Sequence, residues 1–254
     1  MSNKYKSSNN HTLADVKIAI IGYGKMGKEI EKVALERNHT ITHVFSQDMP
    51  FIEAKEIDAD VAIEFTAPHL AVSHMEQCLK LNLPVVVGTT GWAASLPSIE
   101  KATADHNGSI LYASNFSLGV HLFFEMTKKL SKLMDPYDYH PTITESHHTE
   151  KLDQPSGTAI TTAEHILQEL KTLNEWELND STSKINLDKL PIISKRIENV
   201  PGTHEVSFSS DIDELTLTHK ANNRKGFALG AVVAAEWLLD KKGLFTMSDV
   251  LNLK

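Results

Sequence analysis

The stretch Val16-Lys17-Ile18-Ala19-Ile20-Ile21-Gly22-Tyr23-Gly24-Lys25-Met26-Gly27 decides the fold of this 254-residue chain. Its apolar half predicts a short buried strand, and the pattern that follows, through Arg37, predicts a helix. Between them stands G-x-G-x-x-G, whose glycines permit a tight turn, let the backbone approach a pyrophosphate and allow close helix–strand packing. The helix N-terminus favours negative charge. We therefore expect a dinucleotide site, the alternative being a glycine-rich turn of a non-binding α/β domain.

Alternating strands and helices continue to Tyr112, which predicts a doubly wound parallel sheet of the Rossmann type in an α/β fold. The expected elements are strands at 41–45, 61–65, 85–87 and 110–112 and helices at 70–81 and 96–106. Ligands of such sheets bind at the carboxyl ends of the strands. The polar turns Gly88-Thr89-Thr90-Gly91 and Ala113-Ser114-Asn115-Phe116 are expected at that edge.

After residue 117 the pattern changes, and we expect a second, α+β domain built on a mixed sheet. A long helix is predicted at Leu118–Met134, where Asp135-Pro136 ends it. Strands are expected at 142–145, 192–197, 204–208 and 214–219, with helices at 157–173 and from 226 to 239. Residues 174–190 read as a polar excursion.

Composition excludes several classes of protein. A net charge of −8 argues against a nucleic-acid partner, which normally meets a basic face. The single cysteine, Cys78, allows no intrachain disulfide and suits the reducing cytoplasm. No apolar run approaches the roughly 20 residues of a membrane span. Residues 1–14, rich in Ser, Asn and Lys, are expected to be a flexible tail.

The segment Glu145–Ala159, written E-x-H-H-x-x-K-x-D-x-P-S-G-T-A, combines proton donors, a cation and a possible anion-binding turn. If residues 142–146 end a strand, the side chains of His147 to Lys151 leave the sheet at an exposed rim. Pro155-Ser156-Gly157-Thr158 predicts a turn that opens a helix, with backbone N–H groups free to bind a carboxylate or phosphate. The segment suits a small dianionic substrate that needs a proton.

Other interpretations of this segment remain. The two histidines with Glu145 and Glu150 are possible metal ligands. Because adjacent residues of an extended strand point to opposite faces, His147 and His148 would not chelate one ion without a turn, and we expect no metal. Lys151 is alternatively a solvated partner of an acidic neighbour.

The same segment resembles the signature of the dihydrodipicolinate (4-hydroxy-tetrahydrodipicolinate) reductase family, and the resemblance extends from Val16 to about Leu239. It implies an NADH- or NADPH-dependent oxidoreductase that reduces 4-hydroxy-tetrahydrodipicolinate, with loss of water, in the diaminopimelate route to lysine. It also implies a homotetramer formed through the second-domain sheet. In the family the carboxyl-terminal segment returns to the nucleotide domain, which gives the divisions 15–117, 118–225 and 226–254.

The resemblance assigns roles to individual residues. His147 matches the proton donor, Lys151 the assisting cation and His148 a substrate-contacting histidine. The carboxylate-binding turn corresponds to Gly157 and Thr158. The matches to the cofactor site are Gly22, Tyr23, Gly24, Lys25, Met26, Gly27, Gly88, Thr89, Thr90, Ala113, Ser114, Asn115 and Phe116.

One position departs from the usual pattern of dinucleotide sites. About 20 residues beyond the glycines, Asp or Glu normally holds the ribose of NAD, or Arg meets the extra phosphate of NADP. Here Ser46 fits the strand end, and Asp48 would reach only from a longer strand. Cofactor preference is therefore left open. Two other functions are disfavoured: a semialdehyde dehydrogenase would need a cysteine in the second half, and a redox-sensing transcription factor would need a basic helix-turn-helix.

Overall fold

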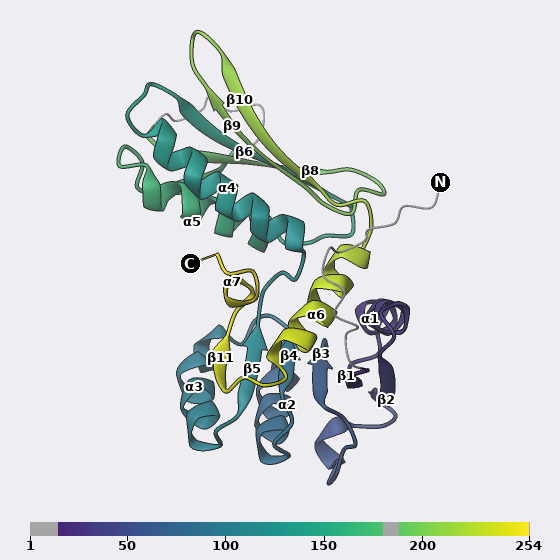
Figure 1. Cartoon of the computed structure of the whole chain (residues 1–254). Coiled ribbons are helices and arrows are strands. Elements are labelled where there is room, and N and C mark those ends of the chain that lie inside the picture. The colour runs from purple at the N-terminus through teal and green to yellow at the C-terminus, as the bar shows by residue number, and fades with distance from the viewer. Residues whose placement is uncertain (1–14, 180–187, 254) are drawn as a thin grey trace.

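A computed structural model of the chain describes residues 15–179 and 188–253 and contains two sheets (Figure 1). The expected tail at 1–14 and part of the expected excursion, 180–187, lie outside the described residues. Among the described residues, no helix has both the length and the apolar character to cross a bilayer.

The first sheet has six parallel strands in the order β11-β5-β4-β3-β1-β2. They are β1 (Lys17–Ile21), β2 (Thr40–Phe45), β3 (Val61–Glu64), β4 (Val85–Val87), β5 (Ser109–Tyr112) and β11 (Gly243–Phe245). The helices of this part are α1 (Lys25–Glu36), α2 (Pro68–Lys80), α3 (Leu96–Asp105), α6 (Lys225–Leu238) and α7 (Met247–Val250), with short 3-10 turns η1 (Phe51–Glu53) and η2 (Ala93–Ser95).

Both faces of this sheet are buried, as its sequence pattern requires. Successive residues of β1 alternate between two hydrophobic clusters: Ile18 and Ile20 pack with α1 and α6, whereas Ala19 and Ile21 pack with α2 and α3. The predicted doubly wound Rossmann-type fold is therefore confirmed.

The order of the strands fixes where a ligand binds. From β1 the chain moves to β2 on one side and then to β3 on the other, so the direction of winding reverses between β1 and β3. The crevice outside the carboxyl ends of strands at such a switch point is the general ligand site of open α/β sheets. The loop after β1 lies at this point.

The second sheet is mixed and has the order β10-β9-β6-β8-β7. Its strands are β6 (His140–His147), β7 (Trp176–Asn179), β8 (Leu190–Arg196), β9 (Thr203–Ser209) and β10 (Glu214–Lys220). The β6–β8 and β7–β8 pairs are parallel, and the β6–β9 and β9–β10 pairs are antiparallel. Helices α4 (Leu118–Met134) and α5 (Gly157–Glu169) lie together on one side of it (Figure 1). The predicted mixed α+β arrangement is thus confirmed as well.

Two strands and one α-helix were absent from the sequence expectation, besides the short turns η1 and η2. Strand β7 lies at the start of the supposed excursion, and β11 and α7 follow the last predicted helix. Helix α4 has the predicted bounds, whereas α5 ends at Glu169, four residues earlier than expected.

Candidate functional site

The glycine-rich loop is held between the ends of β2 and β3. Gly22 has φ +98°, and a Cβ there would lie 2.1 Å from Phe65 O, so only glycine fits. Its amide donates to Phe45 O at 3.0 Å. A Cβ at Gly27 would lie 2.2 Å from Gly22 O, so the first turn of α1 packs directly on the loop.

The N-terminus of α1 is open to an anion. Gly24 is the N-cap and offers no capping side chain, the first turn carries no acidic residue, and no atom lies within 4 Å of the position of a Cβ at Gly24. The first N–H groups of α1 therefore have no capping side chain, and an anion could approach beside Gly24, which suits the phosphates of a dinucleotide. Tyr23 is tied back to Glu31 by a short hydrogen bond, Lys25 is exposed and Met26 is partly buried.

The turn after β4 is held by hydrogen bonds and packs against the residues that follow β3. Gly88 packs under the ring of Phe65, where a Cβ would lie 2.1 Å from the ring Cζ. The Thr89 hydroxyl accepts a hydrogen bond from Thr66 N at 2.7 Å, and Trp92 Nε1 donates to Thr89 O at 2.7 Å. Thr90 is exposed.

Ser46 is exposed and directly follows β2, so the strand ends where the sequence indicated. Ser46 N donates to Met49 O at 3.1 Å, and Met49 N donates to Ser46 O at 3.2 Å. This turn leads the chain away from the strand direction before Asp48 is reached.

The loop after β5 joins the two halves of the molecule. Asn115 Oδ1 accepts from Ser117 N at 2.8 Å, and Asn115 O contacts His121 Nε2 at 2.6 Å. The Asn115 side-chain amide donates to Thr158 Oγ1 at 3.2 Å. A residue expected at the cofactor thereby touches one expected at the substrate. Of the other loop residues, Ala113 is partly buried, Ser114 is exposed and Phe116 is buried.

His147 does not leave the sheet, and that expectation was wrong. Strand β6 continues through His147, which pairs with Arg196 of β8, and its carbonyl accepts from Ile197 N at 2.8 Å. The residue is only 8% exposed. The neighbouring strand extends the hydrogen-bond ladder farther than the polar sequence suggested.

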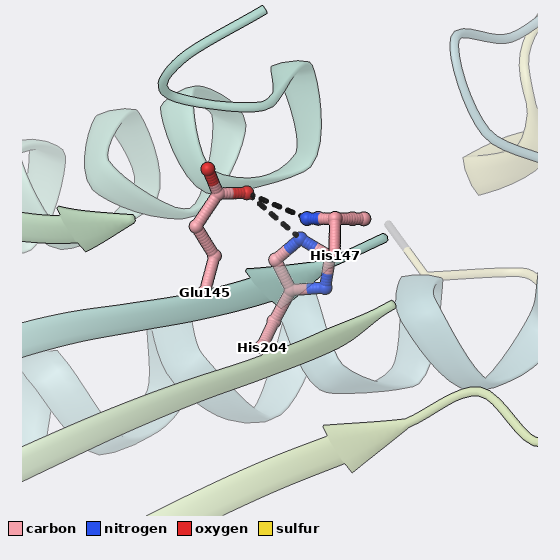
Figure 2. A group of neighbouring side chains, drawn as sticks. All are labelled: Glu145, His147 and His204. Carbon is pink, nitrogen blue, oxygen red and sulfur yellow. Dashed lines mark ion pairs between the residues drawn. The ribbon is translucent and has the colours of Figure 1, made fainter. Parts of the chain in front are cut away.

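A buried cluster surrounds His147 (Figure 2). Glu145, two residues earlier on the same face of β6, is 0% exposed, and its Oε2 lies 3.1 Å from His147 Nδ1. From β9, His204 Nε2 approaches the same oxygen at 3.8 Å, and the rings of the two histidines meet at 5.0 Å between centroids. Side chains alternate between the two faces along a strand. Glu145 and His147 therefore share one face, and the side chain of His148 is directed away from it, as expected for adjacent residues.

The other oxygen of Glu145 is satisfied by hydrogen bonds. Its Oε1 accepts from Ser156 N at 3.0 Å and from Ser194 Oγ at 2.7 Å, and Arg196 Nη2 lies 3.4 Å away. Burial by itself raises the pKa of Glu145, but the contacts with His147, Ser156 and Ser194 outweigh it and hold that pKa well below its ordinary value. The carboxylate is ionised at neutral pH.

His204 has the opposite electrostatic character. Burial, and then the neighbouring His147, lower the pKa of His204 to about 3, so its ring is neutral at physiological pH. Its Nε2 also contacts Ser156 Oγ at 3.1 Å, and that hydroxyl accepts from Ala159 N at 3.2 Å as the N-cap of α5. The start of α5 is thus tied to the histidine cluster.

The cluster also bears on the metal interpretation. Ligand atoms of Glu145, His147 and His204 lie within 4.8 Å of one another. The set differs from the expected one, because His204 replaces His148 and Glu150. Arg196 already places a cation beside Glu145, which opposes a second positive charge there. We interpret the group as a hydrogen-bonding network.

Lys151 is paired in the free protein. Its ammonium donates to both carboxylate oxygens of Asp153, at 2.7 and 2.8 Å, which is one of the partners that the sequence suggested. Arg196 Nε supports this turn by donating to Lys151 O at 3.1 Å. Gly157 is exposed and Thr158 partly buried at the first positions of α5.

An open cleft of about 950 Å³ lies between the two parts of the chain. It is lined by Lys25, Met26 and Glu29 of α1, by His148, Thr149 and Glu150, by Glu198 to Pro201, and by Asn222, Asn223, Arg224 and Phe227. His147, Lys151 and the start of α5 are not among its lining residues. The cleft therefore joins the nucleotide loop to His148, and the His147 cluster lies in the sheet behind it.

Sequence reasoning gave Arg196 and His204 no part in the site. It considered Glu145 only as a possible metal ligand and Ser156 only as part of the turn. The i, i+2 spacing of Glu145 and His147 on one strand was a usable signal, because such residues share a face. Arg196 and His204 come from distant strands, and no local pattern indicates their approach.

Comparison with known proteins gives consistent matches. The model of the dihydrodipicolinate reductase N-terminus matches residues 16–116, and that of the dihydrodipicolinate reductase C-terminus matches residues 119–251. The chain is 46% identical over 236 residues to a 4-hydroxy-tetrahydrodipicolinate reductase of Christiangramia forsetii, covering 92% of this chain and 97% of the relative. It is 37% identical over 231 residues to the reductase of the same name from Rickettsia bellii, covering 89% and 90%.

A solved structure shares the fold. Dipicolinate-bound dihydrodipicolinate reductase from Paenisporosarcina sp. TG-14 superimposes with a TM-score of 0.73 at 24% identity, covering 91% of this chain and 97% of that one.

Proposed function

This chain belongs to the dihydrodipicolinate reductase family, and we propose that it reduces 4-hydroxy-tetrahydrodipicolinate to tetrahydrodipicolinate in the diaminopimelate route to lysine. The substrate loses water, gains a hydride at one carbon and gains a proton at another. The nicotinamide cofactor, when bound, supplies the hydride. The protein must bind two carboxylates, orient the ring and deliver the proton.

The N-terminus of α1 supports binding of the dinucleotide. Gly24 leaves the first N–H groups of a twelve-residue helix uncapped by any side chain. The turns after β4 and β5, which carry Thr89 and Asn115, lie at the carboxyl end of the same sheet. We assign the nicotinamide to these turns, where it faces the second part of the chain.

We assign the substrate carboxylates to His148, Lys151 and the start of α5. Ser156 caps Ala159 N, so the N–H groups of Gly157 and Thr158 have no partner among the described residues and are available to an anion. Lys151 adds a positive charge once it leaves Asp153. Both groups follow the strand that carries His147.

We assign the proton to His147. Histidine exchanges a proton near neutral pH, and this one contacts an ionised carboxylate in a water-poor environment. The observation that carries the proposal is the bond between Asn115 and Thr158, because it brings the cofactor turn against the carboxylate turn.

A second candidate, a semialdehyde dehydrogenase, gains no support. Cys78 is fully buried in α2, and burial, with the charge of Glu64, raises the pKa of its thiol well above the ordinary value. Such a thiol is a poor nucleophile.

The finer features of the proposal concern cofactor, assembly and location. We propose that both NADH and NADPH are accepted. We propose a homotetramer formed through the second sheet. There Ile212, just before β10, is 90% exposed, and Leu215, in β10, is 43% exposed. We also propose a cytoplasmic enzyme and the divisions at residues 117 and 225. The packing of α6 on α1 and the pairing of β11 with β5 support the return of the last segment.

A coupled assay tests the function. Pyruvate and aspartate semialdehyde are condensed enzymatically, this protein is added, and loss of NADH or NADPH is followed. Reduced cofactor should be consumed only when both precursors and the condensing enzyme are present. No consumption by the folded, cofactor-binding protein would exclude the activity.

A further inference from the structure

We propose that Glu145 is a positioning residue that fixes the tautomer of His147 and ties that ring to the carboxylate turn at the start of α5. The inference deepens the proposed function and rests on it where His147 acts as the proton donor. It is carried by the different surroundings of the two oxygens of one buried carboxylate.

Oxygen Oε1 serves as an anchor. It accepts from Ser156 N at 3.0 Å and from Ser194 Oγ at 2.7 Å, and Arg196 Nη2 lies 3.4 Å away. Because Ser156 is the N-cap of α5, the carboxylate fixes the position of the helix start relative to β6. The side chain therefore has little freedom to turn away.

Oxygen Oε2 accepts no hydrogen bond among the described residues, although two imidazoles lie near it. His147 Nδ1 lies 3.1 Å from Oε2 as an ion pair and likewise has no hydrogen-bond partner in the described part of the chain. A buried carboxylate oxygen and a buried ring nitrogen at this distance avoid two unsatisfied groups when the nitrogen carries a proton. Glu145 therefore favours His147 with its proton on Nδ1.

That tautomer leaves Nε2 as the atom that exchanges a proton with the substrate. Nε2 lies beside Gly202. A Cβ added to Gly202 would lie 3.1 Å from this nitrogen. In the protonation step, the N–H bond at Nε2 breaks and a C–H bond forms on the substrate. The electron pair of the broken N–H bond remains on Nε2, and an electron pair of the substrate forms the C–H bond. The ring becomes neutral and keeps its other proton on Nδ1, facing Glu145.

Other titratable or charged groups belong to the same cluster. His204 contacts the ring of His147, Arg196 contacts Glu145, and His219 and Lys151 act on His204. Of these, His204 is neutral near pH 7, and Arg196 and Lys151 each face a carboxylate. Glu145 is thus the anion in direct contact with His147.

The first test compares Glu145→Gln with Ser194→Ala. The glutamine keeps the size, removes the charge and replaces one acceptor oxygen by an NH2 donor, whereas Ser194→Ala removes one bond to Oε1 and keeps the charge. If His147 must be protonated for turnover, kcat falls at high pH. In Glu145→Gln this fall should occur about one pH unit or more lower, because an opposite charge in contact favours the protonated ring by that amount.

In Ser194→Ala the alkaline fall of kcat should keep its position, and KM for the substrate should change by less than about threefold in both variants. A structural role alone would lower kcat equally at every pH. An unchanged position of the alkaline fall in folded Glu145→Gln would overturn the proposal.

The second test reads the wild-type ring directly and uses a variant only to assign its signal. Nitrogen-15 chemical shifts of the histidine rings, with His147 identified by its absence in His147→Asn, report which nitrogen carries the proton. Above the alkaline fall, wild-type His147 should be protonated on Nδ1. A neutral ring protonated on Nε2 would overturn the inference, even if Glu145→Gln fails to fold. Failure of the coupled assay with an Nδ1–H ring would instead exclude the proposed function alone.

Discussion

The side-chain amide of Asn115 donates a hydrogen bond to the hydroxyl of Thr158, 43 residues later, and so connects the turn after β5 to the first turn of α5. The same asparagine is held by Ser117 N and contacts His121 through its carbonyl. This polar contact therefore connects the expected nicotinamide turn with the expected carboxylate turn.

A double-mutant cycle measures this bridge. Asn115→Ala and Thr158→Val should each lower kcat/KM, and the double variant should lose less than the sum, with a coupling of about 0.5–3 kcal/mol typical of residues in contact. The two losses would be strictly additive if the contact had no part in catalysis.

Removal of the proposed proton donor should reduce kcat strongly. His147→Ala should lower kcat by roughly 10²- to 10⁴-fold, the usual contribution of a positioned acid, while NADH binding measured by fluorescence stays intact. His140→Ala is the matched control, because His140 opens the same strand and is exposed. Near-normal turnover of His147→Ala would remove this residue from the mechanism.

Replacing Lys151, the proposed substrate-binding cation, should reduce kcat/KM more than replacing another lysine. Lys151→Ala should lose about ten- to a hundredfold in kcat/KM, because a charge-assisted contact contributes roughly 1.5–3 kcal/mol. Lys225→Ala is the comparison, since Lys225 is engaged with Glu36 at 2.6 Å. Equal losses in the two variants would indicate that Lys151 is only surface charge.

Cofactor discrimination should be weak. Ser46 offers neither a carboxylate to the ribose nor a cation to the extra phosphate, so kcat/KM for NADH and NADPH should differ by less than about tenfold, or ~1.4 kcal/mol. Ser46→Glu should shift preference toward NADH and Ser46→Arg toward NADPH. A wild-type preference beyond about a hundredfold would mean that another residue reads the ribose.

Acid should destabilise the fold through His204. Its pKa is about 3 when folded and about 6.5 when unfolded, so the unfolded chain binds the extra proton between these values and stability falls as pH decreases from about 6.5 toward 3. Between pH 7 and 5 this contributes a loss of about 2 kcal/mol.

Urea unfolding at pH 7 and pH 5 tests that contribution. His204→Asn should lose less stability than the wild type over this interval, by roughly 1–2 kcal/mol. His140→Asn, at an exposed position of the same sheet, should behave like the wild type. The same pH dependence in all three proteins would contradict the assignment to His204.

Local patterns explain why most of the fold was predictable. Apolar periodicity, glycine placement and a terminating proline predict the βα unit at Val16–Arg37 and helix α4. Strand β11 has only three residues and becomes a strand because β5 offers an open edge, which is tertiary information. Strand β7 likewise depends on its pairing with β8.

The candidate site likewise has a part that the local sequence predicts and a part that depends on tertiary contacts. The motif from Glu145 to Thr158 concentrates its chemistry in one segment, so its residue types could be read directly. The burial of His147 could not, because it follows from the strand alongside it. Arg196 and His204 reach Glu145 only through the sheet, from 51 and 59 residues away in sequence.

Helix α6 has a consequence for biosynthesis of the chain. Its residues Ala231, Val232 and Ala235 fill the same cluster as Ile18 and Ile20, near the opposite end of the sequence. A ribosome extends a chain by about 5–20 residues each second, so the first strands wait for roughly 10–40 seconds with one face uncovered. During that interval the nascent nucleotide fold is a natural client for chaperones, and a message truncated before α6 yields a product suited to proteolysis.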